Sequence, residues 1–572
     1  MEHFDVVVVG SGFGGSVAAY RAAEAGLKVC LLERGKAYAP GTFPRGPAGY
    51  RDNFWDPSEG LHGMFNVWSF DALEAVVSSG LGGGSLIYAN VLIRKDPKWF
   101  VREGFRNGGY EYWPVTYEAL EPHYETVEKM LGATPFPFAH KPYSDTPKTR
   151  ALQMAAERLG KRWYLPNLAI TFGNDPLHPV PGEPLREPEG NYHGVNNRSS
   201  CRMCGECDVG CNFGAKNSLD FNYITAAKRA GADIRTRAEV RSFSSLPRAG
   251  YKIEYVSHEG SKEREPRATQ ALPVRAITAS RLVLSAGTLG TTYLMMKNRA
   301  ALPRVSATLG SRFCGNGDFL SFAFTCADQV DGRRVPRPLS PTAAPVITST
   351  IRGGDFADGE SGPGFYLQDA GYPEWVSWLV EGLNAPSEPE RFARVLKERA
   401  LAFLTGNPNR NIGNVLSELI GEADTSHCSM PLLGMGRDTP DGTMALRERD
   451  GQAYLNVDWR AAGSSDYIER VRETSRGVAE ALGGKYIESP MAKLLNRLIT
   501  VHPLGGCPMG RNPNEGVVDA FGRVFGCPGL YIADGSVMPG PVGPNPSLTI
   551  AALADRFTEQ LIHDHNAVPT HS

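Results

Sequence analysis

No apolar run in the sequence reaches the ~18 residues that a membrane-spanning helix requires. The net charge is only −2, and no basic stripe with interleaved aromatic residues is present, so nothing suggests a nucleic acid partner. The N-terminus lacks the charged stretch and cleavage site of a secretory signal, because residues that suit a strand begin at Phe4. We therefore expect a cytoplasmic protein without a transmembrane span.

Cysteine is scarce, and ten cysteines in 572 residues do not make a disulfide scaffold. Four of them form the run Cys201-x2-Cys204-x2-Cys207-x3-Cys211. Its spacing is that of a bacterial ferredoxin ligand run, although that run ends Cys-Pro and this one ends Cys-Asn. A contiguous run suits an iron–sulfur cluster better than zinc, which usually takes two separated pairs. Three interpretations stay open: an iron–sulfur cluster, a zinc site, and a vestigial or redox-active thiol cluster.

The N-terminal residues carry a dinucleotide-binding pattern. An apolar strand is expected over residues 4–9, a helix over 16–25 and a second strand over 27–32, which ends on Glu33. Glu33 follows the glycines by close to the ~20 residues expected of a ribose-binding carboxylate. The loop between the first strand and the helix would bring backbone N–H groups and the positive helix end to a pyrophosphate. That loop contains Gly10, Gly12, Phe13, Gly14 and Gly15.

Two later regions also suit a backbone that closely approaches a ligand. Residues 80–90 hold four glycines and Ser85, followed by apolar residues that favour burial over a flexible linker. Near the C-terminus, His502 stands in a Pro/Gly loop, and Asp534 follows an apolar strand. Asn545 stands between two prolines, just before a helix expected through residues 551–561.

The length of the chain predicts two or more intertwined lobes. Strands are expected over 233–240, 251–256 and 281–288, the last followed by a helix over 291–297, which returns the chain to the nucleotide domain. Residues 115–160 predict two helices, the first with an apolar stripe formed by Tyr117, Leu120, Tyr124, Val127 and Leu131. Residues 320–490 predict a mainly antiparallel sheet with helices, with strands such as 319–324, 346–351 and 454–458. A basic amphipathic helix over 391–404 suits either packing on its own domain or peripheral membrane contact, and packing is favoured.

Taken together, these motifs resemble the glucose–methanol–choline (GMC) oxidoreductases, and more closely the bacterial cholesterol oxidase branch. The resemblance implies an α/β fold, in which a Rossmann-like FAD-binding domain is joined to a discontinuous α+β substrate-binding domain. It implies an FAD-binding domain made of residues 1–45, 212–320 and 495–572. Residues 46–211 and 321–494, with the cysteine cluster at 201–211, would then form the substrate-binding domain.

The resemblance also implies site residues. Gly10, Gly12, Gly15 and Glu33 would bind the ADP half of FAD, and Asn90 would lie near the flavin edge. His502 would take or orient the hydroxyl proton, and Asn545 would hydrogen-bond the hydroxyl oxygen while hydride passes to flavin N5. No histidine lies within residues 80–90, so noncovalent FAD is favoured. The remaining implied cofactor contacts are Gly82, Gly83, Gly84, Ser85, Asp534, Gly535, Pro546 and Ser547.

The function expected from this resemblance is oxidation of an alcohol CH–OH group to a carbonyl, on a sterol or another bulky hydrophobic alcohol. Oxygen or an electron-carrier protein would be the acceptor. One alternative is an FAD/iron–sulfur dehydrogenase of a sugar or other alcohol. Another is a noncatalytic flavin redox module, which the presence of both His502 and Asn545 disfavours. Aromatic residues at 54–55, 65–70 and 372–378 slightly favour a hydrophobic substrate pocket.

Overall fold

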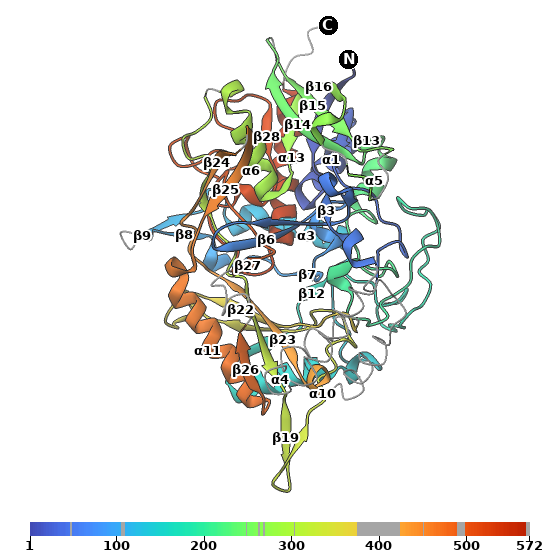
Figure 1. Cartoon of the computed structure of the whole chain (residues 1–572), viewed down its shortest axis with the longest axis vertical. Helices are drawn as coiled ribbons and strands as arrows, with labels where there is room; N and C mark the ends of the chain where they lie inside the picture. Colours follow the sequence, from blue (N-terminus) through green and yellow to red (C-terminus); the bar gives the residue numbers. More distant parts are fainter. Residues whose placement is uncertain are drawn as a thin grey trace, which may run out of the picture.

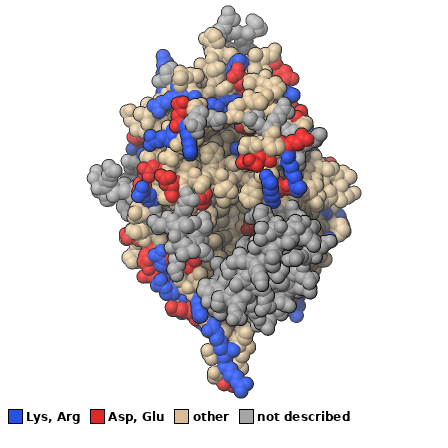
Figure 2. Space-filling view, viewed as in Figure 1, with Lys and Arg blue, Asp and Glu red and all other residues tan. Residues whose placement is uncertain are grey.

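The computed structural model describes residues 1–45, 49–104, 109–247, 249–260, 264–266, 269–302, 304–374, 424–449, 451–488 and 498–567 (Figure 1). The amphipathic helix expected over 391–404 lies outside these residues. No helix in these ranges is long and apolar enough to cross a membrane. Figure 2 shows charges of both signs interspersed over the described part of one face.

A seven-stranded sheet carries the N-terminal motif, in the order β13-β2-β1-β16-β15-β14, with β28 also paired to β16. Strands β13, β2, β1, β16 and β28 run parallel, and β14 and β15 add an antiparallel extension. The bounds are β1 His3–Val9, β2 Val29–Leu32, β13 Asp233–Arg235, β14 Ala238–Ser245, β15 Tyr251–Ser257, β16 Val274–Leu284 and β28 Leu530–Ile532. This arrangement confirms the α/β class that the βαβ pattern predicts.

Three strand predictions need correction. The single strand expected over 233–240 is two strands, β13 and β14, which pair with different neighbours. The chain breaks between them because Arg237 adopts φ +55°, and its N–H donates to Gly35 O. Strand β16 begins seven residues before the expected position, since its first half pairs with β15 and only its end pairs with β28. The strand expected over 346–351 is β21, Thr350–Gly353.

Three helices cover the parallel sheet and share its core: α1 Phe13–Glu24, α3 Tyr117–Leu131 and α13 Ser547–Asn566. The apolar stripe predicted on α3 is buried, with Leu120, Tyr124 and Val127 all at 0% exposure. Helix α13 begins at Ser547, directly after the Asn545-Pro546 pair. The motif residues therefore stand at the N-terminal end of a long buried helix.

The second body is an antiparallel six-stranded sheet in the order β11-β21-β22-β23-β18-β26. Figure 1 places it below the parallel sheet, with α4 and α11 packed against it. A buried ion pair, Lys148 Nζ to Asp369 Oδ2 at 2.7 Å, ties α4 to β22. The bounds are β11 Arg162–Tyr164, β22 Phe365–Asp369, β23 Met430–Gly436, β18 Phe319–Phe324, β26 Lys485–Glu488, α4 Pro147–Arg158 and α11 Ser465–Ala481. The antiparallel sheet predicted within 320–490 is therefore confirmed.

Smaller sheets and hairpins connect the two bodies, and the hairpin β19–β20 projects from the lower end (Figure 1). The remaining strands are β3 Trp55–Asp56, β4 Leu61–His62, β5 Phe65–Ser69, β6 Leu73–Ser78, β7 Val91–Leu92, β8 Val101–Gly104, β9 Gly109–Tyr112, β10 Thr134–Pro135, β12 Asn167–Leu168, β17 Ser311–Phe313, β19 Ala327–Val330, β20 Arg333–Pro336, β24 Gly442–Arg449, β25 Gln452–Asp458 and β27 Leu498–Thr500. The remaining α-helices are α5 Tyr223–Arg229, α6 Gly287–Lys297 and α10 Asp424–His427.

Candidate active site

The two glycine-rich loops meet through the side chain of Ser11. The Ser11 hydroxyl donates to Glu33 Oε2 at 2.6 Å and accepts the Gly82 N–H at 3.0 Å. Glu33 Oε1 accepts the Gly35 N–H at 2.8 Å, so both oxygens of this buried carboxylate support the loops. Glu33 thus stands at the end of β2, where the ribose-binding acid is expected, and it also holds the first glycine loop in place.

The glycines of the first loop differ in the space around them. A Cβ on Gly14 would lie 1.4 Å from Ala533 O, and one on Gly15 would lie 1.9 Å from Gly10 O. These contacts show why the backbone there can carry no side chain. A Cβ on Gly12, in contrast, would meet no atom within 4 Å, so Gly12 faces open space at the start of α1. This combination forms a cradle of the kind a pyrophosphate occupies at a helix N-terminus.

The second loop ends on Asn90, which is fully buried and adopts φ +68°. Both its Oδ1 and its Nδ2 lack a hydrogen-bond partner among the described residues. An unpaired buried amide costs ~1–3 kcal/mol, so this side chain indicates a polar group bound beside it. Within the same loop the Ser85 hydroxyl donates to Gly82 O at 2.7 Å and accepts the Leu219 N–H at 3.0 Å.

Asp534 follows strand β28 by two residues, and its side chain is enclosed by hydroxyl groups. Oδ2 accepts from Thr291 Oγ1 at 2.5 Å, and Oδ1 accepts both the N–H and the hydroxyl of Ser536. Burial raises the pKa of Asp534, and the bonds from Ser536 and Thr291 oppose that shift. Gly535 stands one residue on, with no room for a side chain because a Cβ would lie 2.8 Å from Thr288 Oγ1.

The loop before α13 is held by a buried lysine. Lys95 Nζ donates to Pro541 O at 2.8 Å and Val542 O at 3.1 Å, and it lies 4.4 Å from the ring centre of Trp113. Burial lowers the pKa of Lys95 well below its usual value. The loop also packs tightly against Trp99, since a Cβ on Gly543 would lie 2.5 Å from that ring. Asn545, Pro546 and Ser547 are therefore presented on a fixed backbone.

One short segment, residues 315–318, forms hydrogen bonds with the loops of both predicted catalytic residues. Asn316 Nδ2 donates to Pro544 O at 3.0 Å, and Asn316 Oδ1 accepts the Gly543 N–H at 2.9 Å, directly before Asn545. Two residues further on, Asp318 Oδ1 bonds His502 Nδ1 at 2.6 Å. The loop of His502 and the loop of Asn545 are thus fastened to the same stretch of chain.

Asp318 was not predicted from the sequence, although it follows the turn-rich run Gly315-Asn316-Gly317 directly before β18. Its Oδ2 accepts the Thr500 hydroxyl at 2.8 Å and the Val501 N–H at 2.7 Å. His502 keeps 18% of its side chain exposed. The carboxylate therefore fixes both the backbone and the ring of the histidine.

Gln368 was also missed, and it contacts the other predicted catalytic residue. Its Nε2 donates to Asn545 Oδ1 at 2.9 Å. Gln368 is fully buried in β22, and its own Oε1 has no partner among the described residues. A lone amide in the apolar run Phe365-Tyr366-Leu367 was the available signal, because a buried polar side chain in a strand requires a partner.

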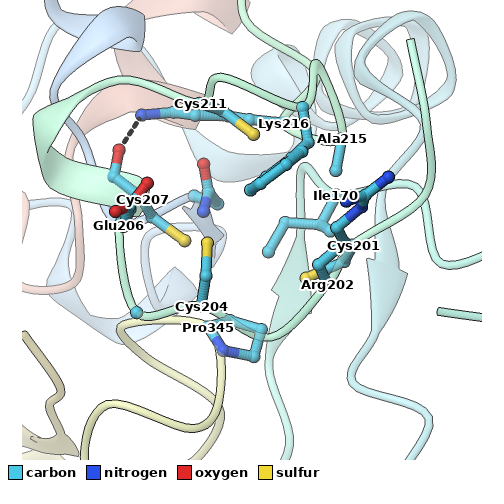
Figure 3. A pocket seen from close by; sticks show the side chains of 13 residues that line it. Ile170, Cys201, Arg202, Cys204, Glu206, Cys207, Cys211, Ala215, Lys216 and Pro345 are labelled. Atoms are coloured by element: carbon cyan, nitrogen blue, oxygen red, sulfur yellow. Dashed lines mark hydrogen bonds between the residues drawn. The ribbon is translucent and has the colours of Figure 1, made fainter. Parts of the chain in front are cut away.

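The four clustered cysteines line one pocket, together with Asn90 and Lys216 (Figure 3). The sulfur atoms of Cys204 and Cys207 point toward one another, and Cys201 lies across the pocket. In the described part of the chain, no group of three or more His, Cys, Asp or Glu side chains is arranged to hold a metal ion. The structure thus brings the predicted cysteines together without placing them as metal ligands.

The environment of these thiols favours their protonated form. Burial raises the pKa of Cys204 to about 12 and of Cys207 to about 11, with neighbouring thiols adding to the effect at Cys204. Lys216 Nζ donates to the carbonyl oxygens of Leu86, Tyr88 and Cys207 at 2.6–3.0 Å. Burial lowers the pKa of Lys216 to about 8. This lysine thereby joins the second glycine loop to the cysteine run.

The aromatic stretches expected to line a substrate pocket pack, where they are described, in several separate clusters. Trp55 stacks edge-on with His62 and His258, and Phe70 belongs to the core cluster under β6. Tyr372 packs with Phe322 and Phe324, while residues 375–378 lie outside the described ranges.

The βαβ cradle and the buried unpaired amide of Asn90 are the features of a dinucleotide-binding site. The family model described as GMC oxidoreductase matches residues 190–311 and 438–554, and an FAD binding domain model matches residues 5–42. Cholesterol oxidase of Mycobacterium tuberculosis is 30% identical over 97% of this chain and 90% of its own length. Cholesterol oxidase of Acinetobacter baumannii is 27% identical over 98% of this chain and 95% of its own length. The chain belongs to the GMC oxidoreductase family.

More distant relatives share the whole length of the chain. Paromamine 6'-oxidase of Streptomyces fradiae is 26% identical over 98% of this chain and 92% of its own. A formate oxidase structure superposes with a TM-score of 0.59 at 16% identity, covering 99% of both chains, which shows a shared fold. The protein is therefore an FAD-dependent enzyme that oxidises an alcohol. Its open cradle at Gly12 and the unpaired amide of Asn90 fit this cofactor.

Proposed function

We propose that the protein oxidises the CH–OH group of a sterol, or of a comparably bulky hydrophobic alcohol, to a carbonyl. The observation that carries the chemistry is the pair His502 and Asn545, each held by a side-chain hydrogen bond, and the loops of both are bonded to residues 315–318. The substrate class rests on the two cholesterol oxidases among the relatives. Oxygen is the proposed acceptor, because these relatives are oxidases.

In this proposal the chain binds FAD noncovalently, and FAD, when bound, would supply the acceptor for the hydride that leaves the alcohol carbon. The residues proposed to hold it are Gly10, Gly12, Phe13, Gly14, Gly15, Glu33, Gly82, Gly83, Gly84, Ser85, Asn90, Asp534, Gly535, Asn545, Pro546 and Ser547. The N-terminus of α13 would stabilise negative charge at the pyrimidine end of the flavin. The domain division at residues 45/46, 211/212, 320/321 and 494/495 remains part of the proposal.

The residues of this chain supply the proton chemistry. His502 would accept the hydroxyl proton as the carbon–hydrogen bond breaks, and Asn545 would donate a hydrogen bond to the oxygen that becomes a carbonyl. Fixing the oxygen between two side chains orients the carbon, which is how positioning lowers the barrier. Because Gln368 and Asp318 each hold one of these side chains by a hydrogen bond, neither needs to reorganise during the reaction.

A second candidate is an FAD/iron–sulfur dehydrogenase that passes electrons to a carrier. It is favoured by one observation: the four cysteines line a pocket that also contains Asn90, a proposed flavin neighbour. The same pocket would serve a dithiol cluster without iron.

The substrate and the acceptor can be tested together. The purified protein is mixed anaerobically with cholesterol in detergent micelles, a long-chain primary alcohol or an amino sugar, and bleaching of the oxidised flavin band is followed. We expect cholesterol to give the largest second-order rate, with stoichiometric peroxide on readmission of air and no iron or acid-labile sulfide. Preference for the sugar would contradict the substrate class. Stoichiometric iron lost in Cys204→Ser would favour the dehydrogenase.

A further inference from the structure

We propose that Gln368 and Asp318 are positioning residues that give the catalytic pair opposite hydrogen-bonding polarity. Gln368 leaves Asn545 with only its Nδ2 donor facing the substrate, and Asp318 leaves His502 with only its Nε2 acceptor. The inference rests on the proposed alcohol oxidation and adds to it which atom of each side chain meets the hydroxyl group.

The orientation of the Asn545 amide follows from Gln368. Gln368 Nε2 donates to Asn545 Oδ1 at 2.9 Å, which occupies the acceptor end of Asn545. In the observed orientation, one N–H and the Oε1 of the fully buried Gln368 have no hydrogen-bond partner among the described residues. If both amides were turned around, Gln368 would accept a bond from Asn545, and both of its own N–H groups would be left unpaired. Orphaned buried N–H groups are the rarer and more costly case, so the observed orientation is preferred.

The backbone beneath Gln368 is fixed by the next residue. Asp369 Oδ2 accepts from Lys148 Nζ at 2.7 Å, and Asp369 Oδ1 accepts the Thr348 and Ser349 N–H groups. All four of these side chains are fully buried. Strand β22 also pairs with β21 and β23 on its two sides, so Gln368 has little freedom to turn away from Asn545.

Asp318 determines which nitrogen of the His502 ring carries the proton. A carboxylate can only accept, and Asp318 already receives bonds from the Thr500 hydroxyl and the Val501 N–H. The Nδ1 contact at 2.6 Å therefore places the proton on Nδ1. In a neutral imidazole the other nitrogen, Nε2, is then the acceptor.

An acceptor and a donor together match one hydroxyl group. The alcohol O–H points to His502 Nε2, and a lone pair of the same oxygen receives the Asn545 N–H, which selects a single orientation of the group. A site with two acceptors could bind only the proton and would leave the developing carbonyl without a donor.

The test compares two replacements of Gln368: one that can force the reversal and one that only removes the anchor. In Gln368→Glu, assayed at a pH at which the side chain is ionised, the carboxylate only accepts, so Asn545 must turn its Nδ2 toward residue 368 and present Oδ1 to the substrate. In Gln368→Met the anchor is lost, but nothing forces the reversal. We expect the rate of anaerobic flavin reduction to fall about 10²–10³-fold in the Glu variant and about tenfold or less in the Met variant, with flavin content unchanged.

A second readout does not depend on turnover. A ketone product accepts hydrogen bonds but donates none, so its dissociation constant, measured by perturbation of the flavin spectrum, reports the Asn545 donor directly. It should rise at least about tenfold in Gln368→Glu and less in Gln368→Met. Equal effects of the two variants on both measurements would overturn the assignment to Gln368.

Asp318→Asn tests the role assigned to Asp318 toward His502, and this test does not depend on whether the Gln368 variants fold. Asparagine can donate to Nδ1 and so favours the proton on Nε2, and kcat should fall about 10²–10⁴-fold with KM changed less than about threefold. Asp318→Glu, which keeps the acceptor, should recover part of the loss. Equal activity of the Asn and Glu variants would overturn the assignment of Asp318 as a positioning residue. If the wild-type protein is reduced by no alcohol, the proposed function itself fails.

Discussion

Ser11 and Gly82 are 71 positions apart in the chain, yet the Gly82 N–H donates to the Ser11 hydroxyl at 3.0 Å. That hydroxyl in turn donates to Glu33, so one buried side chain fastens the two loops proposed to hold FAD. The cofactor site is thereby built as a single unit from three separated stretches of sequence.

Ser11→Ala should loosen that unit. Two hydrogen bonds are lost and the Gly82 N–H and Glu33 Oε2 lose a partner, which amounts to ~1–3 kcal/mol. We expect the dissociation constant of FAD, measured by titrating apoprotein, to rise about tenfold or more. Ser69→Ala, which removes an exposed bond to Glu74, serves as the control. Unchanged FAD affinity in Ser11→Ala would contradict the described role.

Asn90→Gly should separate cofactor binding from stability of the apoprotein. Glycine accepts the φ of +68° and removes an amide that has no partner among the described residues. The melting temperature of the apoprotein should therefore change little, while FAD binding weakens about tenfold for each bond lost. A large loss of apoprotein stability with normal FAD affinity would show that the amide is structural.

Asp438→Asn should change how stability depends on pH. Burial raises the pKa of Asp438 to about 7, and nearby Asp318 adds to the rise. A carboxyl group whose pKa is raised on folding binds its proton more tightly when folded, so the free energy of unfolding falls as pH rises from about 4 to about 7. The total effect is at most about 4 kcal/mol.

Asparagine cannot ionise but still accepts the Gly315 N–H, so the variant should melt at a higher temperature than wild type near pH 8 and show a smaller difference near pH 5. Exposed Asp466→Asn on α11 provides the matched control. A difference that grows toward acid pH would contradict this assignment.

Lys216→Met should disconnect the cysteine pocket from the second glycine loop. Three carbonyl oxygens lose their shared buried donor, which we expect to lower the free energy of unfolding by about 3–5 kcal/mol. FAD affinity should fall as well, because Leu86 and Tyr88 belong to that loop. Thermal melting and FAD titration check both effects, and Lys485→Met, at an exposed position of β26, serves as the control. A stable variant with normal FAD affinity would rule out the link.

The sequence was most informative where a local pattern fixes the structure. The βαβ unit around Gly10 and Gly15 was predictable because glycine, strand and helix signals agree over adjacent residues. Asp318 and Gln368 were missed because their meaning comes from contacts across 184 and 177 positions, with His502 and Asn545. No local spacing encodes such contacts. The split at Arg237 was missed because a positive φ in a non-glycine residue is set by tertiary bonds to Gly35.

In the proposed mechanism, His502 performs the proton chemistry of alcohol oxidation in this site. The rate of anaerobic flavin reduction by cholesterol micelles, compared between wild-type protein and His502→Ala at matched flavin content, tests this role. We expect bleaching in the wild type and a rate at least about 10²-fold lower in the variant. Equal rates in the two proteins would contradict it.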